Sequence, residues 1–111
     1  MSGSNSQASV AESYGRLPDL TAARLAKAQA HDWGVPVDAY LIDAADFESR
    51  LVAYVYADLS GRLDDGMTIV TPPVELISQY KGMALFRTMC GKDNYVLVSR
   101  LLGALTLSSA R

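Results

Sequence analysis

The sequence predicts an α+β fold in which one N-terminal helix packs on a mostly antiparallel, curled sheet of about five short strands. Two observations lead to this class. Residues 21–31 consist mainly of strong helix formers, and the rest of the chain is a series of short β-favouring segments separated by turn residues. Strands do not alternate with helices, so a parallel nucleotide-binding sheet is not expected.

The length and composition indicate a small domain that folds without disulfides. The chain has 111 residues, of which 50% are apolar. We expect residues 1–15, rich in Ser, Gly and Gln, to be a disordered tail and residues 16–111 to be a single α+β domain. The only cysteine, Cys90, favours a reducing cytoplasm. Neither a signal-peptide pattern nor an apolar run of about 20 residues is present, so we expect no membrane association.

The helix is expected to begin after Pro18, with Asp19 as its N-cap, and to end before Gly34 and Pro36. One stripe along this helix is apolar: Ala22, Leu25, Ala26, Ala30 and Trp33. A second stripe is basic: Arg24, Lys27 and His31. We expect the apolar stripe to face the sheet and Trp33 to be buried against it.

Most strand segments are bounded by clear turn signals. The expected elements are strands at 35–42 and 67–71, a short extended or helical piece at 74–78, a hairpin of 83–89 and 95–99 around a loop at 91–94, and a last strand or amphipathic turn at 100–107.

Residues 43–61 allow two interpretations. A helix capped by Asp43 would carry Phe47, Leu51, Val55 and Leu59 on one side. The other interpretation is an acidic turn at 43–48 followed by a strand at 51–57. The second is favoured because Val52, Tyr54, Val55 and Tyr56 prefer extended backbone.

No constellation of residues predicts catalysis, a metal or a cofactor. One His and one Cys cannot build a zinc site, although His31 and Cys90 could in principle form a nucleophile pair. The segment Asp58-x-Ser60-x-Arg62-x-Asp64 has a calcium-loop rhythm with an arginine at a ligand position. Phosphate-loop and nucleophile-elbow motifs are absent from the sequence. Two acidic sets remain as candidate acid–base groups: Asp43, Asp46 and Glu48, and Asp58, Asp64 and Asp65.

Nucleic acid is not an expected partner. Basic and aromatic residues do approach one another near the C-terminal hairpin: Tyr80, Lys81, Phe86, Arg87, Lys92, Tyr95 and Arg100. However, strand alternation places Phe86 and Arg87 on opposite faces, and the pI near 5.2 opposes nonspecific backbone affinity.

Self-association is the expected partnership. Leu101, Leu102, Leu105 and Leu107 would fall on both faces of a terminal strand, and one thin layer cannot bury both. These leucines are therefore the candidate assembly surface of a homodimer, since one self-complementary patch would serve both chains.

Several turn and strand residues form a pattern over residues 51–99. They are Gly61-Arg62-Leu63-Asp64-Asp65-Gly66, then Ile69, Thr71 and Val74, Leu85-Phe86 with Thr88, and Tyr95-Val96-Leu97-Val98. This pattern resembles short uncharacterised bacterial proteins found in genomes, phages, integrons and other mobile elements. The resemblance implies a bacterial origin and the strand interpretation of residues 51–57, and it implies no activity.

Together these observations predict a non-enzymatic interaction or small-ligand-binding module in the bacterial cytoplasm. Two other functions stay open. One is a small enzyme with an acidic pocket between helix and sheet, using residues such as Asp58 or Asp65. The other is a mobile-element accessory protein that modulates a host protein. A pocket with convergent titratable groups would favour the enzyme, whereas a large flat apolar patch would favour assembly.

Overall fold

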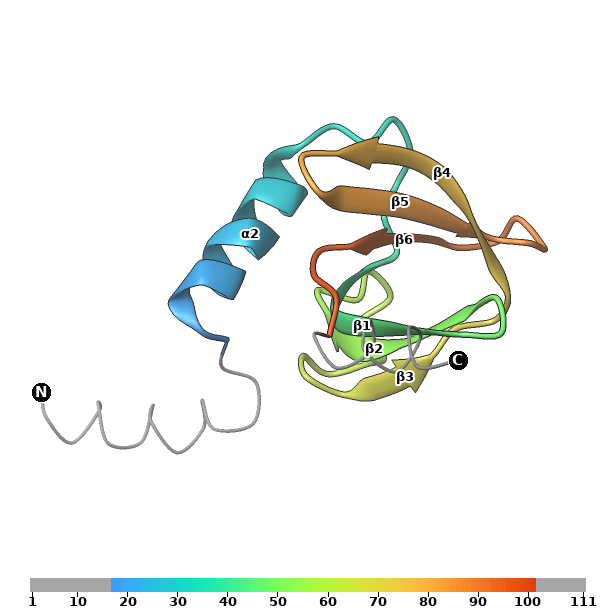
Figure 1. Cartoon of the computed structure of the whole chain (residues 1–111), viewed down its shortest axis with the longest axis horizontal. Coiled ribbons are helices and arrows are strands. Elements are labelled where there is room, and N and C mark those ends of the chain that lie inside the picture. The colour runs from blue at the N-terminus through green and yellow to red at the C-terminus, as the bar shows by residue number, and fades with distance from the viewer. Residues whose placement is uncertain (1–16, 102–111) are drawn as a thin grey trace, which may run out of the picture.

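The computed structural model describes residues 17–101 of the chain. The elements in this range are α2 (Asp19–Ala30), β1 (Ala39–Phe47), β2 (Arg50–Tyr56), β3 (Thr68–Val70), β4 (Val74–Tyr80), β5 (Met83–Thr88) and β6 (Asn94–Leu97) (Figure 1). The expected α+β class is confirmed, with a helix packed on a mixed sheet of six strands. The expected tail at residues 1–15 and nearly all of the expected last strand at 100–107 lie outside the described residues.

The sheet has the strand order β3-β2-β1-β6-β5-β4, and only the β1–β6 pair is parallel. Residues 71–73 carry the chain from one edge strand to the other (Figure 1). At this corner the Thr71 N–H donates to the Leu51 carbonyl at 2.9 Å, and the Val74 N–H donates to the Ser49 carbonyl at 2.8 Å. The sheet is therefore curled but not closed.

Each face of the sheet has its own apolar cluster. The inner cluster draws on all six strands and centres on Leu41, Leu51, Val55 and Leu97. The outer cluster lies under the helix and contains Ala28, Trp33, Ile42, Tyr56, Met83, Leu85, Val96 and Val98. Neighbouring residues of one strand, such as Leu41 and Ile42, belong to different clusters because successive side chains point to opposite faces.

The β1–β2 hairpin settles the ambiguous segment. The strand interpretation of residues 51–57 is confirmed and the helix alternative is wrong. The acidic turn expected at 43–48 is also wrong, because β1 continues to Phe47. Asp43 occupies a β-bulge with φ of 53°, where its N–H donates to the Ser99 hydroxyl at 2.9 Å. The turn itself is Glu48–Ser49, with φ of 48° and 68°.

The first expected strand begins later than predicted. The sequence predicts a strand over residues 35–42, whereas β1 starts at Ala39. Val35 and Val37 instead pack against the outer cluster as part of the connection from the helix.

The helix presents a different side to the sheet from the one expected. Ala22, Ala26 and Ala30 are exposed, whereas Ala28 is fully buried and Leu25 packs on the outer cluster. Arg24 contributes to this orientation, because its guanidinium group donates to the Val98 carbonyl on the same side of the helix. Asp19 is not the N-cap: Pro18 occupies that position without a side-chain cap. The predicted burial of Trp33 is confirmed at 8% exposure.

Candidate ligand-binding site

The β4–β5 turn places a lysine at the edge of the sheet beside α2. Tyr80 pairs with Met83, so only Lys81 and Gly82 connect the two strands. Their φ angles are 49° and 79°, which is the positive pair that a type I′ turn requires. Gly82 adopts this conformation without a steric penalty, whereas Lys81 does not. The turn therefore exposes the Lys81 side chain at its tip, at some cost in backbone strain.

Arg24 connects the helix to this turn and to the end of β6. Its Nη2 donates to the Val98 carbonyl at 2.8 Å and to the Gly82 carbonyl at 3.4 Å. Its Nε also donates to the Val98 carbonyl, at 3.2 Å. Neutral carbonyls thus position the guanidinium group without cancelling its charge. Within residues 17–101 its Nη1 has no hydrogen-bond partner.

A small aromatic cluster closes one end of the site. The rings of His31 and Tyr80 stack with centroids 3.7 Å apart and an interplanar angle of 11°. Trp33 meets both rings edge-on, at 4.5 Å from His31 and 6.2 Å from Tyr80. Its indole N–H donates to the Ala28 carbonyl at 2.9 Å and so satisfies an acceptor at the C-terminal end of α2.

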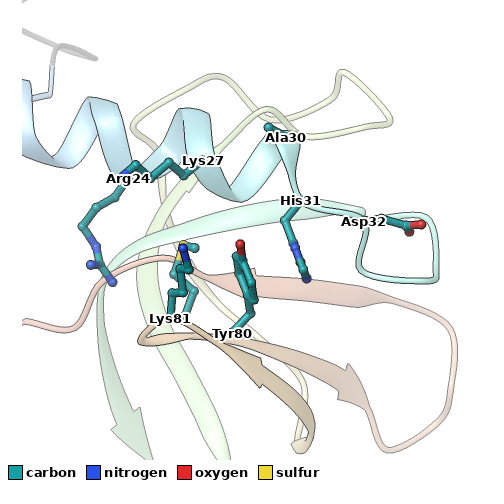
Figure 2. A pocket seen from close by; sticks show the side chains of 8 residues that line it. Arg24, Lys27, Ala30, His31, Asp32, Tyr80 and Lys81 are labelled. Carbon is teal, nitrogen blue, oxygen red and sulfur yellow. The ribbon is translucent and has the colours of Figure 1, made fainter.

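These elements border a cavity of about 440 Å³ between α2 and the β4–β5 turn, which is half open to solvent. Its lining residues are Arg24, Lys27, Ala30, His31, Asp32, Tyr80, Lys81 and Met83 (Figure 2). Figure 2 shows Lys81 and Tyr80 extending from the turn toward the helix, while the Asp32 carboxylate points away from them. That carboxylate accepts the Gly34 N–H at 2.8 Å. The volume lies within the range of small-molecule sites.

The electrostatics of the cavity favour an anion. Arg24, Lys27 and Lys81 line it together, and in the described part of the chain no carboxylate lies within ion-pair distance of any of the three. The ion pair between Arg100 and Asp46, at 2.9 Å, involves none of the lining residues. Unpaired like charges around one concave surface create a positive potential that attracts anions.

The acidic sets predicted from the sequence lie elsewhere. The Asp58 carboxylate accepts the Ser60 hydroxyl at 2.7 Å and the N–H groups of Arg62 and Leu63 at 3.0 and 3.1 Å. These bonds, the Ser60 hydroxyl first, hold the pKa of Asp58 below its ordinary value. Asp65 accepts the Ala57 N–H at 2.8 Å. Both aspartates thus organise the β2–β3 loop, and neither lines the helix–sheet cavity.

The remaining acids do not converge on a cleft with the loop aspartates. Asp43 sits in the β1 bulge, Asp46 pairs with Arg100, and Glu48 is in the exposed β1–β2 turn. Asp64 is exposed in the β2–β3 loop. Over residues 17–101 no group of three or more His, Cys, Asp and Glu side chains could hold a metal ion.

Cys90 and His31 are not neighbours. His31 packs on Tyr80, beside the start of β5, whereas Cys90 follows the other end of β5. Cys90 is also exposed, not half-buried as a structural thiol would be. Hydrogen bonding to the Thr88 hydroxyl, followed by smaller effects that include the Lys92 charge, lowers the pKa of the Cys90 thiol.

The basic and aromatic residues of the C-terminal hairpin do not share one surface. Phe86 and Tyr95 pair across β5 and β6 and pack on the inner cluster. Burial raises the pKa of the Tyr95 hydroxyl, aided by nearby acids. Of this set, only Tyr80 and Lys81 line the cavity.

The candidate assembly leucines are described in part. Leu101 is 45% exposed and lines a shallow hollow of about 120 Å³ with Val52 and Tyr54. Leu102, Leu105 and Leu107 lie outside the described residues. The assembly surface therefore stays a prediction.

Sequence reasoning did not identify this cavity, although one signal was present. Arg24, Lys27 and His31 repeat at helical spacing, and this basic stripe, not the apolar stripe expected to face the sheet, turns toward the β4–β5 turn. Comparison with known proteins yields no matching family model, curated relative or solved structure. No helix within residues 17–101 is long and apolar enough to cross a membrane.

Proposed function

We propose that the protein is a non-enzymatic module that binds a small anionic molecule between α2 and the β4–β5 turn. One observation supports this proposal: Arg24, Lys27 and Lys81 converge on a cavity of about 440 Å³ without a carboxylate paired to any of them in residues 17–101. The lining also contains His31 and Asp32, but among residues 17–101 it holds no Ser, Thr or Cys that such a base could activate, so binding fits it better than catalysis.

The two lysines give the sharpest test, because Arg24 also holds the helix to the sheet. Lys27 and Lys81 are exposed, and the side chain of neither takes part in a hydrogen bond or ion pair with the described residues. Lys27→Gln and Lys81→Gln should therefore leave the fold intact. Each should weaken anion binding about tenfold, since a charge-assisted hydrogen bond contributes about 1.5–3 kcal/mol before solvent screening.

Isothermal titration calorimetry of the full chain with inorganic phosphate and with ribose 5-phosphate measures this effect. Lys92→Gln is the matched control, because it removes the same charge from the β5–β6 loop outside the cavity. Equal affinity of the wild type and the Lys27→Gln/Lys81→Gln double variant would contradict the proposal.

A second candidate function is self-association as a homodimer. The outer face of the β1–β3 half of the sheet exposes Phe47, Tyr54, Val70 and Leu101. The strand register places Tyr54 and Val70 on the same face, and Leu101 shares a hollow with Tyr54. Exposed apolar side chains gathered in this way are typical of contact surfaces. A second copy is the proposed occupant because a two-fold arrangement lets one self-complementary patch serve both chains.

Light scattering tests the dimer. The wild type should be dimeric at micromolar concentration, and Leu101→Lys or Leu105→Lys should weaken the dimer or yield an aggregating monomer. A wild type that stays monomeric at high micromolar concentration would remove this candidate.

A bacterial cytoplasmic location is also proposed, since an exposed free thiol such as Cys90 is maintained most readily in a reducing compartment. Cell fractionation measures it directly. Membrane-bound or secreted material would contradict the location without bearing on the cavity.

A further inference from the structure

We infer that the ligand of this cavity is a phosphate monoester of a non-aromatic, hydroxyl-rich molecule, such as a sugar phosphate. This inference rests on the proposed function and specifies the ligand class. Three properties of the lining carry it: the donors that remain available, the occupied aromatic faces, and the polar groups at the end away from the lysines.

The first property separates phosphate from carboxylate. Arginine binds both carboxylates and phosphates through two parallel N–H groups, and a carboxylate, which has only two oxygens, depends on that fork more than a phosphate does. In Arg24, Nε and Nη2 already donate to the Val98 carbonyl, so this fork is not available to a ligand. Nη1 remains, beside two lysine ammonium groups that act as point charges with three donors each. A tetrahedral phosphate dianion, with three terminal oxygens, matches donors that approach from separate elements.

The second property argues against a nucleobase. An open aromatic face is a common platform for a nucleobase, but the Tyr80 ring offers none. His31 stacks on one side at 3.7 Å, and Lys81 Nζ lies 5.6 Å from the ring centroid. Figure 2 shows His31 and Lys81 on opposite sides of Tyr80. Trp33 is buried beneath His31 and Tyr80, so it offers no platform either.

The third property concerns the rest of the ligand. The cavity holds about fifteen water volumes, which is more than one inorganic phosphate requires. His31 and Asp32 line the end away from Arg24 (Figure 2). The His31 imidazole can both donate a hydrogen bond to a ligand hydroxyl and accept one from it. Hydroxyl groups are the ligand chemistry that satisfies a mixed set of this kind.

Calorimetry with four compounds tests the class on the full chain: inorganic phosphate, ribose 5-phosphate, AMP and citrate. Ribose 5-phosphate should bind at least tenfold more tightly than inorganic phosphate and citrate, and AMP should not exceed ribose 5-phosphate by more than about threefold. Lys27→Gln should weaken ribose 5-phosphate binding about tenfold, as one charge-assisted bond would.

Other outcomes of the calorimetry would each contradict a different part of the inference. AMP binding tenfold tighter than ribose 5-phosphate would show a base site and refute the non-aromatic assignment. Tighter binding of citrate would refute phosphate while leaving the anion-binding function in place. Binding only to vesicles that contain phosphatidylinositol 4-phosphate would assign the phosphate to a lipid and overturn the small-molecule inference. If neither the four compounds nor the vesicles bind, both the inferred ligand class and the proposed anion-binding function are refuted.

Discussion

Replacing Lys81 with Asn should separate folding from ligand binding, because the two properties should change in opposite directions. Lys81 is a non-glycine residue with φ of 49° at the first central position of a type I′ turn, where Asn followed by Gly is the preferred pair. A left-handed conformation costs an ordinary residue about 1–2 kcal/mol, and Asn tolerates it better. Against this gain stands the loss of the Lys81 cation over the Tyr80 ring, about 0.5–1 kcal/mol at an exposed site.

The net effect on the free energy of unfolding should therefore lie between zero and about 1 kcal/mol of stabilisation. Binding of ribose 5-phosphate should weaken about tenfold, because one of three cations is removed from the cavity. Urea denaturation of the ligand-free protein measures the first quantity, and calorimetry measures the second.

Lys92→Asn is the control for this prediction. Lys92 lies outside the cavity and does not have a positive φ, so neither stability nor affinity should change appreciably. Destabilisation by more than about 1 kcal/mol in Lys81→Asn would refute the turn argument. Unchanged affinity would refute the role of Lys81 in binding.

Three further predictions concern the fold and the titrating groups. Trp33→Ala should lower the free energy of unfolding by about 3–5 kcal/mol, because the buried indole packs on two rings and caps α2. Urea denaturation followed by circular dichroism measures this loss. A loss below about 1 kcal/mol would contradict the anchoring role of Trp33. Because the folded pKa of Asp58 is lowered, its stabilising effect should be present above the unfolded value near pH 4 and lost as pH falls toward the folded pKa. Asp58→Asn should therefore reduce the acid-side slope of stability against pH, and an unchanged slope would show that the carboxylate bonds are immaterial. Cys90 should react with a thiol reagent at lower pH than a free cysteine does, because its pKa is lowered, and Thr88→Val should shift the rate profile back toward that of free cysteine.

The fold class and several strands could be predicted because their signals are local. The β-branched and aromatic run of β2 and the glycine-containing loop between β5 and β6 specify their own conformation. β1 could not be located correctly because its acidic residues resemble a turn. In the structure Asp46 is on an exposed part of the strand, and Asp43 enters a bulge stabilised by Ser99, which is distant in sequence. That partner is supplied by tertiary structure and leaves no local signal.

The orientation of α2 at the candidate site also depends on contacts that are distant in sequence and therefore could not be predicted. By composition, the alanine-rich stripe is the apolar one, and burial of apolar area alone would turn it inward. The observed orientation includes hydrogen bonds from Arg24 to the Val98 carbonyl, 74 residues away in the sequence. Sequence periodicity identified both stripes, but it could not rank an arginine with two available carbonyl acceptors above three alanines. The cavity was missed for this reason.

A positive φ angle does not by itself mark a residue of the cavity, since Asp43, Glu48, Ser49 and Ala57 also have positive φ angles and do not line it. Lys81 differs because its strained backbone lies beside two other features that are unusual in a folded protein. Arg24 lies on the sheet-facing side of a helix, and three cations gather without a paired carboxylate in residues 17–101. Like charges so placed repel one another in the free protein, and a bound anion relieves that repulsion. A single departure from local rules is common in natural folds, but three occur around this one cavity, and the proposed anion ligand would account for the clustered charges among them.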